Sequence, residues 1–195
     1  MGRARLAREG LYGSHVELFR EVALADGDGT WELRCGQLVG KPPMTMDHNF
    51  QAADIVRQLN NQLDDDVYSV RQNAGHVRVA DDLYVVPDVA VIPMDSLRAR
   101  AGQPTTLEEY AEALPFVAEI WSRSTGDYDS DTKLPAYRAR GDLEIWRVHP
   151  YERTVVAWRR KPDGSYTESR YHERGRVRIE SLPGVSIDLG KVFRL

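Results

Sequence analysis

Two dense apolar runs, at 83–92 and 116–121, each carry one acidic residue, and this pair constrains the fold more than any other feature of the sequence. Asp88 follows Pro87 inside the first run, and Glu119 lies inside the second. Short apolar runs of this kind are typical of buried strands. A carboxylate carried into such a strand needs a partner, because desolvating an unpaired charge is costly.

The hydrophobic pattern elsewhere predicts an α/β (α+β) protein built on one central mixed sheet flanked by helices, with a strand-rich C-terminal half. We expect helices at 16–25, at about 45–63 with Thr45 or Asp47 as its cap, and before Gly141. We expect strands at 31–39 with a turn at Cys35-Gly36, and at 67–71, 77–79, 144–148, 154–159, 166–171 and 176–179, with one more after 182. The polar segment 96–112 predicts a loop with a helical turn.

The size and composition are those of an ordinary globular domain. The chain has 195 residues, of which 42% are hydrophobic and 29% are charged. We expect a loose N-terminal arm at 1–14 and a single domain at 15–195. No apolar run approaches the roughly 18 residues of a membrane span, and no secretory signal is apparent. Cys35 is the only cysteine, which excludes a disulfide framework. A cytoplasmic protein without membrane contacts follows as the expectation.

Charge is distributed unevenly along the chain. The net charge is −4, yet residues 134–178 hold eleven Lys or Arg against six Asp or Glu. One interpretation is that this basic segment faces a phosphate backbone while acids elsewhere hold a metal. The other is that these arginines are solvated faces of exposed strands, and charge alone favours this second interpretation.

Asp88 and Glu119 on neighbouring strands suggest a shared cation. Hard divalent ions such as Mg²⁺ prefer oxygen ligands and commonly take one or two carboxylates. Lys133 follows the second acid and could stabilise developing negative charge. The alternative is that Asp88 lies at a strand edge and Glu119 points outward, as acids on outer strand faces commonly do. Spacing alone favours that alternative.

A longer motif surrounds the second acid. The run Glu119-Ile-Trp-Ser-Arg-Ser-Thr125, followed by Asp129, Lys133-Leu-Pro135, Tyr137, Gly141 and Glu144-Ile-Trp146, resembles the signature of the Uma-type restriction endonuclease family of the PD-(D/E)XK nuclease superfamily. Further matches are Trp31-Glu32-Leu33, Gly36, Leu38, His48, Pro87-Asp88-Val89, Leu182-Pro-Gly-Val185 and Asp188-Leu189. The resemblance therefore extends over most of the chain.

The resemblance implies a restriction endonuclease-like fold and a metal-dependent endonuclease that hydrolyses phosphodiester bonds of DNA with Mg²⁺, for which Mn²⁺ can substitute. Asp88 and Glu119 would be metal ligands, with the backbone carbonyl of Ile120 as a third. The superfamily places a lysine two residues after the second acid, where this chain has Trp121. The resemblance therefore assigns the catalytic lysine to Lys133, in the following helix.

Additional candidates each have a functional and a structural interpretation. Glu32 matches an early glutamate of the family, although its strand pattern favours an exposed position. His48 could contact the scissile phosphate from a helix N-terminus, although a lone histidine before an apolar stripe is more often structural. Asp129 could position Lys133 or form an ordinary helical pair with it. Tyr137 could line the site or fill the core. Hydroxyl groups that could contact phosphate or belong to a turn are those of Ser122, Ser124 and Thr125.

A different class of function remains open from the sequence. The chain could be a non-catalytic nucleic-acid-binding or protein-interaction module that retains the nuclease fold. The acidic pI of 5.8 and the missing motif lysine favour this alternative. An enzyme for a small phosphorylated substrate is a third hypothesis, for which we expect a closed pocket. Duplex cleavage needs two cuts, which favours a homodimer, although the sequence shows no dimer interface.

Overall fold

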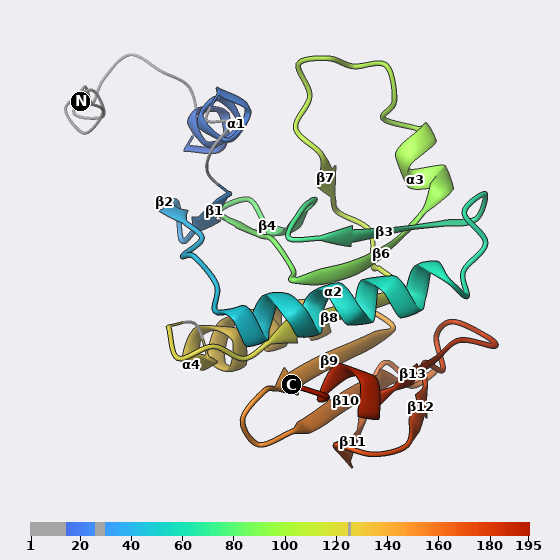
Figure 1. Ribbon diagram of the computed structural model, residues 1–195. Coiled ribbons are helices and arrows are strands. Elements are labelled where there is room, and N and C mark those ends of the chain that lie inside the picture. The colour runs from blue at the N-terminus through green and yellow to red at the C-terminus, as the bar shows by residue number, and fades with distance from the viewer. Residues whose placement is uncertain (1–14, 26–29, 125) are drawn as a thin grey trace.

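The computed structural model describes residues 15–25, 30–124 and 126–195. The expected arm at 1–14 and the turn at 26–29 lie outside these residues. The chain forms a mixed α/β structure with several sheets flanked by helices (Figure 1), as the sequence predicted. No helix formed by the described residues has the length and apolar character needed to cross a membrane.

The central sheet has six strands and carries most of the core. Its strands, in spatial order, are β11 (Tyr166–His172), β10 (Thr154–Arg160), β9 (Glu144–His149), β8 (Phe116–Ile120), β6 (Val89–Pro93) and β3 (Tyr68–Gln72). Neighbours are antiparallel except β8 and β9, which are parallel. This is the mixed sheet expected from the sequence, and its parallel pair requires the helical crossover that follows β8.

A second sheet of five strands lies beside the first and was not expected. Its order is β2 (Gln37–Gly40), β1 (Trp31–Arg34), β5 (Leu83–Val85), β4 (His76–Ala80) and β7 (Glu109–Tyr110). The long apolar run splits at Pro87-Asp88, so that β5 belongs to the second sheet and β6 to the first. The polar segment 96–112 contains β7 in addition to the end of a short helix, α3 (Met94–Arg98).

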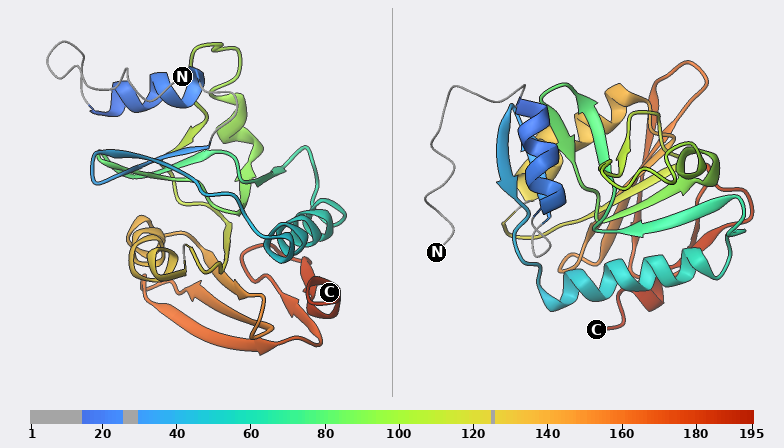
Figure 2. Two further views of the ribbon diagram at one scale, coloured as in Figure 1. Left: turned by 60° about the vertical axis from the view of Figure 1, so that its left-hand side comes forward. Right: turned by 90° about the horizontal axis from the view of Figure 1, so that it is seen from above.

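Helices cover the two faces of the six-stranded sheet (Figure 2). Helix α2 (Met46–Asn60) begins at Thr45, whose side chain accepts a hydrogen bond from the amide of His48. It packs on one face together with the two-stranded sheet of β12 (Arg176–Arg178) and β13 (Ser186–Asp188) and with helix α6 (Leu189–Val192). Helix α1 (His15–Ala25) contacts β1 of the second sheet.

The opposite face is covered by the segment between β8 and β9. It starts with one turn, α4 (Gly126–Tyr128), continues as a π-helical turn, η1 (Asp129–Lys133), and ends as α5 (Leu134–Arg140). Gly141 stops α5 in a left-handed conformation with φ 87°, which favours glycine. The expected helix before Gly141 is therefore confirmed, with Pro135 in its first turn.

Side chains alternate between two cores along β6 and β8. Val89 and Ala118 pack toward α2, whereas Ala90 and Val117 pack toward α5 and the second sheet. Both faces are thus apolar, which explains why these strands read as continuous hydrophobic runs. Polar groups between these strands are far from water and must find partners within the protein.

Candidate active site

Asp88 and Glu119 lie at the same end of the β6–β8 pair. The pairing ends at Val89 of β6 and Ala118 of β8, so Asp88 directly precedes the paired residues of β6 and Glu119 directly follows those of β8. The two acids are linked through Val86, because the ammonium beside Asp88 (Lys41) and the ammonium beside Glu119 (Lys133) lie 3.1 Å and 3.3 Å from its carbonyl oxygen. The exposed fractions of Asp88 and Glu119 are 2% and 4%. The expectation that they are edge or outward-facing acids is therefore wrong, because both carboxylates are buried.

Three donors surround the carboxylate of Asp88. Its Oδ1 lies 2.7 Å from the ammonium of Lys41, and its Oδ2 lies 2.9 Å from Nε2 of His48. The backbone amide of Ile120 also donates to Oδ2, over 2.7 Å. Burial alone raises the pKa of Asp88, but Lys41 and His48 outweigh it and hold this pKa well below its usual range. Asp88 is therefore ionised, as a metal ligand must be.

Glu119 is held by two side chains of the crossover segment. The hydroxyl of Tyr137 donates to Oε1 over 2.5 Å, and Nζ of Lys133 lies 3.3 Å from the carboxylate oxygens. Burial and the nearby Glu119 raise the pKa of Tyr137 well above its usual value, so its hydroxyl stays protonated and acts as a donor. Tyr137 thus contacts the site and also belongs to the core, which unites the two interpretations of this residue.

Lys133 lies between two acids. Its Nζ is 3.2 Å from Oε1 of Glu32, 3.3 Å from Glu119 and 3.3 Å from the carbonyl of Val86. Lys133 is the last residue of η1, and its side chain is buried. Single π-helical turns occur frequently at functional sites, because the wider turn redirects a side chain out of the regular helical spacing.

Glu32 is fully buried, so its predicted exposed position is wrong. It accepts hydrogen bonds from Arg34, whose Nη2 is 2.6 Å from Oε2, and from the amide of Val86, 2.9 Å from Oε1. Burial raises the pKa of Glu32, but Lys133, the Val86 amide and Arg34 together lower it below its usual value. The strand pattern failed here because β1 is covered on both faces, by a separate core cluster of Leu33, Phe19 and Tyr84 on one and by the site on the other.

Two basic residues of the site were missed by the sequence interpretation. Lys41 contacts Asp88, and its Nζ also lies 2.7 Å from Oδ1 of Asn73 and 3.1 Å from the carbonyl of Val86. Arg34 neutralises Glu32 and lies over the ring of Tyr128, with Cζ 3.7 Å from its centroid. Lys41 lies before a double proline in a segment without periodicity, so no pattern could have placed it.

The remaining candidates differ in their placement. His48 is fully buried on the first turn of α2 and reaches Asp88, so it contacts the site and also has a structural role. Ser122 is buried and lies within 3.1 Å of the hydroxyl of Ser124. The backbone of Asp129 lies in η1, but its side chain, like all of Thr125, is outside what the structure describes. Trp121, at the motif lysine position, stacks on His149 with ring centroids 4.4 Å apart.

The donor set suits a hard divalent cation. Asp88 and Glu119 offer carboxylate oxygens, the ligand type that such ions prefer, and each carboxylate also lies beside an ammonium that offsets part of its charge. Glu32 and Glu119 both contact the ammonium of Lys133. Among the described residues a three-acid group that could hold a metal is Asp64, Asp65 and Asp66, but all three residues are exposed, and exposed acidic groups are common without a metal.

The mixed sheet flanked by helices is the architecture of a restriction endonuclease-like fold, and two buried acids and a buried lysine lie at its centre. The model of the Uma2 family, described as "Putative restriction endonuclease", matches residues 16–190, so the chain belongs to this family. The structure is similar to a crystal structure from Anabaena variabilis described as a "putative nuclease belonging to DUF820". The TM-score is 0.72 at 15% sequence identity, over 94% of this chain and 98% of the other, which supports the fold. No curated protein matches the chain.

Proposed function

We propose that the protein is a divalent-metal-dependent endonuclease that hydrolyses phosphodiester bonds of DNA. The observation that carries this proposal is the placement of two buried acids, Asp88 and Glu119, at the same end of the β6–β8 pair, with the ammonium of Lys133 beside Glu119. Family membership and the nuclease-like fold support the same reaction class. Two buried carboxylates are costly to maintain, which favours a functional reason for keeping them.

Asp88 and Glu119, together with the backbone carbonyl of Ile120, would hold Mg²⁺ or Mn²⁺. The cation would supply charge neutralisation at the scissile phosphate and lower the pKa of a water. His48 and the amide of Ile120 fix the Asp88 carboxylate, while Tyr137 fixes that of Glu119. Ligands fixed in this way lose little entropy when they bind an ion.

Lys133 is the proposed catalytic lysine. Its ammonium lies at hydrogen-bond distance from Glu119 and Glu32, so its position is determined by two acids and the carbonyl of Val86. From there it would orient the attacking water or stabilise the negative charge that develops on the phosphate oxygens. Glu32 then acts as a positioning residue for Lys133 and not as a third metal ligand.

The surroundings of Glu119 favour a polymer over a small phosphorylated substrate. The cavity that borders this acid is lined mainly by core side chains, among them Leu134, Ile145, Trp146 and Trp158. Such a lining offers few polar groups to bind a free phosphate ester. DNA, in contrast, can be held by basic residues spread over the surface of the protein.

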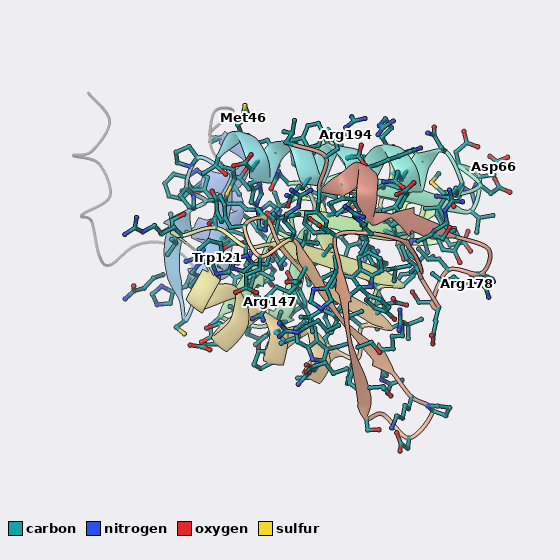
Figure 3. All side chains as sticks on the ribbon, turned by 60° about the horizontal axis from the view of Figure 1, so that its bottom comes forward. Met46, Asp66, Trp121, Arg147, Arg178 and Arg194 are labelled. Atoms are coloured by element: carbon teal, nitrogen blue, oxygen red, sulfur yellow. The ribbon has the colours of Figure 1, made fainter. Side chains whose placement is uncertain are left out.

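The basic segment 134–178 contributes only in part to such a surface. Arg140 and Arg159 are mostly buried in ion pairs with Asp142 and Glu144. The basic residues of the segment that are exposed are Arg138, Arg153, Arg160, Lys161, Arg170, Arg174, Arg176 and Arg178. Figure 3 shows Arg178 far from Trp121, so a duplex that contacted both would cross a large part of this face.

The decisive experiment incubates supercoiled plasmid with the protein and Mg²⁺ or Mn²⁺. We expect nicking by the wild type and none by Glu119→Gln or Asp88→Asn at equal folded concentration. Asp65→Asn, in the exposed acidic group, is the matched control and should cleave like the wild type. Cleavage by Glu119→Gln at the wild-type rate would exclude the proposed site. Metal-independent DNA binding without cleavage would support the alternative of a non-catalytic module.

A homodimer and a cytoplasmic location stay predictions. Sedimentation of the protein with and without DNA tests whether it is a homodimer.

A further inference from the structure

Lys41 has no assigned role, yet it is among the most constrained side chains of the site. An ammonium has three N–H donors, and Lys41 has three acceptors within reach. They are Oδ1 of Asp88 at 2.7 Å, Oδ1 of Asn73 at 2.7 Å and the carbonyl of Val86 at 3.1 Å. Its side chain is only 7% exposed. Lys41 is therefore held at a fixed position and is not a surface lysine that contacts Asp88 in passing.

The two oxygens of Asp88 have different surroundings. Oδ2 accepts two hydrogen bonds, one from Nε2 of His48 and one from the backbone amide of Ile120. Oδ1 accepts from Lys41. A cation that approaches Asp88 would therefore meet the oxygen that carries the ammonium. Two cations at one buried carboxylate oxygen repel each other strongly, because the interior screens charge poorly.

We propose that Lys41 competes with the divalent metal for Asp88, so that the free protein binds the metal weakly and the DNA phosphate completes the site. This inference rests on the proposed nuclease function. The phosphate brings negative charge that offsets the repulsion between Lys41 and the metal. Metal and DNA would then bind cooperatively, and by thermodynamic reciprocity each raises the affinity of the other by the same factor.

The same arrangement would keep the metal site largely empty until DNA is bound. Lys133 adds a second positive charge near the acids, at 3.3 Å from Glu119. Among the described side chains, Glu32 is compensated separately by Arg34, with Nη2 2.6 Å from Oε2. The acids nearest the proposed metal therefore each have an internal counter-cation, which is unfavourable for a tight resident metal.

The test measures Mn²⁺ binding to the full chain by titration calorimetry in the absence of DNA. We expect Lys41→Met to bind Mn²⁺ about tenfold more tightly than the wild type, or more, since it removes the competing charge. Lys41→Arg retains the charge and should bind as weakly as the wild type. Lys191→Met removes an exposed lysine on α6 and controls for the change in overall charge. Lys41→Gln provides a second neutral variant if Lys41→Met does not fold.

A second titration includes a phosphorothioate-linked duplex oligonucleotide, which resists cleavage. We expect the duplex to raise the Mn²⁺ affinity of the wild type about tenfold and that of Lys41→Met much less. Equal Mn²⁺ affinity of the wild type and both neutral variants would overturn the inference, even where the wild type cleaves plasmid. If the neutral variants bind Mn²⁺ more tightly but no protein cleaves DNA, the nuclease proposal fails and the competition at Asp88 remains.

Discussion

The backbone amide of Ile120 donates a hydrogen bond to the carboxylate of Asp88 over 2.7 Å. The side chain of Asp88 thereby continues the pairing of β6 with β8 by one more step, in place of a backbone carbonyl. Asp88 therefore joins two central strands and is also the ionised acid that contacts Lys41 and His48 in the candidate site. Loss of activity after substitution of Asp88 needs a separate measurement of stability before it is assigned to chemistry.

Neutralising Asp88 should destabilise the fold through Lys41. Asp88→Asn leaves a buried ammonium without its counter-charge, and removing one partner of a buried pair costs about 3–5 kcal/mol. Urea unfolding followed by circular dichroism measures the free energy of unfolding. The double variant Lys41→Met/Asp88→Asn should lose less than the sum of the single losses, by about 1 kcal/mol or more. Additive losses would mean that the two side chains do not interact directly.

Glu32 should affect the cleavage rate without changing metal affinity. Glu32→Gln keeps the shape of the side chain but removes one of the two acids that hold Lys133. Substitution of residues that orient a functional group commonly costs about 10–100-fold. We expect a rate loss of that size in plasmid nicking, with Mn²⁺ affinity within twofold of the wild type (about 0.4 kcal/mol). Glu180→Gln, at an exposed acid, is the control. A parallel loss of Mn²⁺ affinity would identify Glu32 as a ligand instead.

The sequence predicted most of the elements that build the central sheet. β6 and β8 are buried on both faces, so their sequences are short continuous apolar runs, a pattern typical of buried strands. The hairpin of β1 and β2 has its turn at Cys35-Gly36, both with positive φ, as the turn residues indicated. Four strands of the second sheet fall in segments where strands were expected, but their assembly into a separate sheet was not predicted, because it depends on the pairing of β1 with β5. The two-residue β7 lies in a segment expected to be a loop and pairs with β4 over a long sequence separation.

The residues of the candidate site also divide into those that the sequence indicated and those that it could not indicate. Asp88 and Glu119 were proposed because an acid is conspicuous in an apolar run, and Lys133 because it follows the second acid. The family motif added Tyr137 and the assignment of Lys133 as the catalytic lysine. Lys41 and Arg34 could not be found by either route. Lys41 precedes a double proline, and Arg34 lies at the end of a strand where arginine is ordinarily solvated. Their roles depend on β1 lying beside β5, which is a tertiary contact that local pattern does not encode.

Gly126 should be needed to place the crossover segment. A Cβ at this position would clash with the indole nitrogen of Trp121, so alanine must displace either the tryptophan or the start of α4. Overpacking of this kind costs about 1–3 kcal/mol. We expect Gly126→Ala to lower the melting temperature and reduce cleavage, since η1 with Lys133 follows directly. Gly40→Ala, where the added Cβ meets only ordinary contacts with Trp31, should change neither. An unchanged melting temperature in Gly126→Ala would contradict the close packing.

His76 should make the stability fall in mild acid. Burial lowers the pKa of His76 below its ordinary value of 6.5, although hydrogen bonds at Trp31 and Glu108 and the charges of Glu109 and Glu32 oppose this shift. The unfolded chain therefore takes up a proton more readily than the folded protein. The contribution of neutral His76 to the free energy of unfolding is fully present above about pH 6.5 and is lost as the pH falls through the lowered pKa.

Urea unfolding at pH 7.5, 6.5 and 5.5 measures the slope of the free energy of unfolding against pH. His76→Gln retains a donor toward the carbonyl of Trp31, which lies 2.9 Å from Nε2, and should flatten the slope between pH 6.5 and 5.5. His172→Gln, at an exposed histidine, should leave the slope as in the wild type, and an equal slope in both variants would exclude His76 as its source.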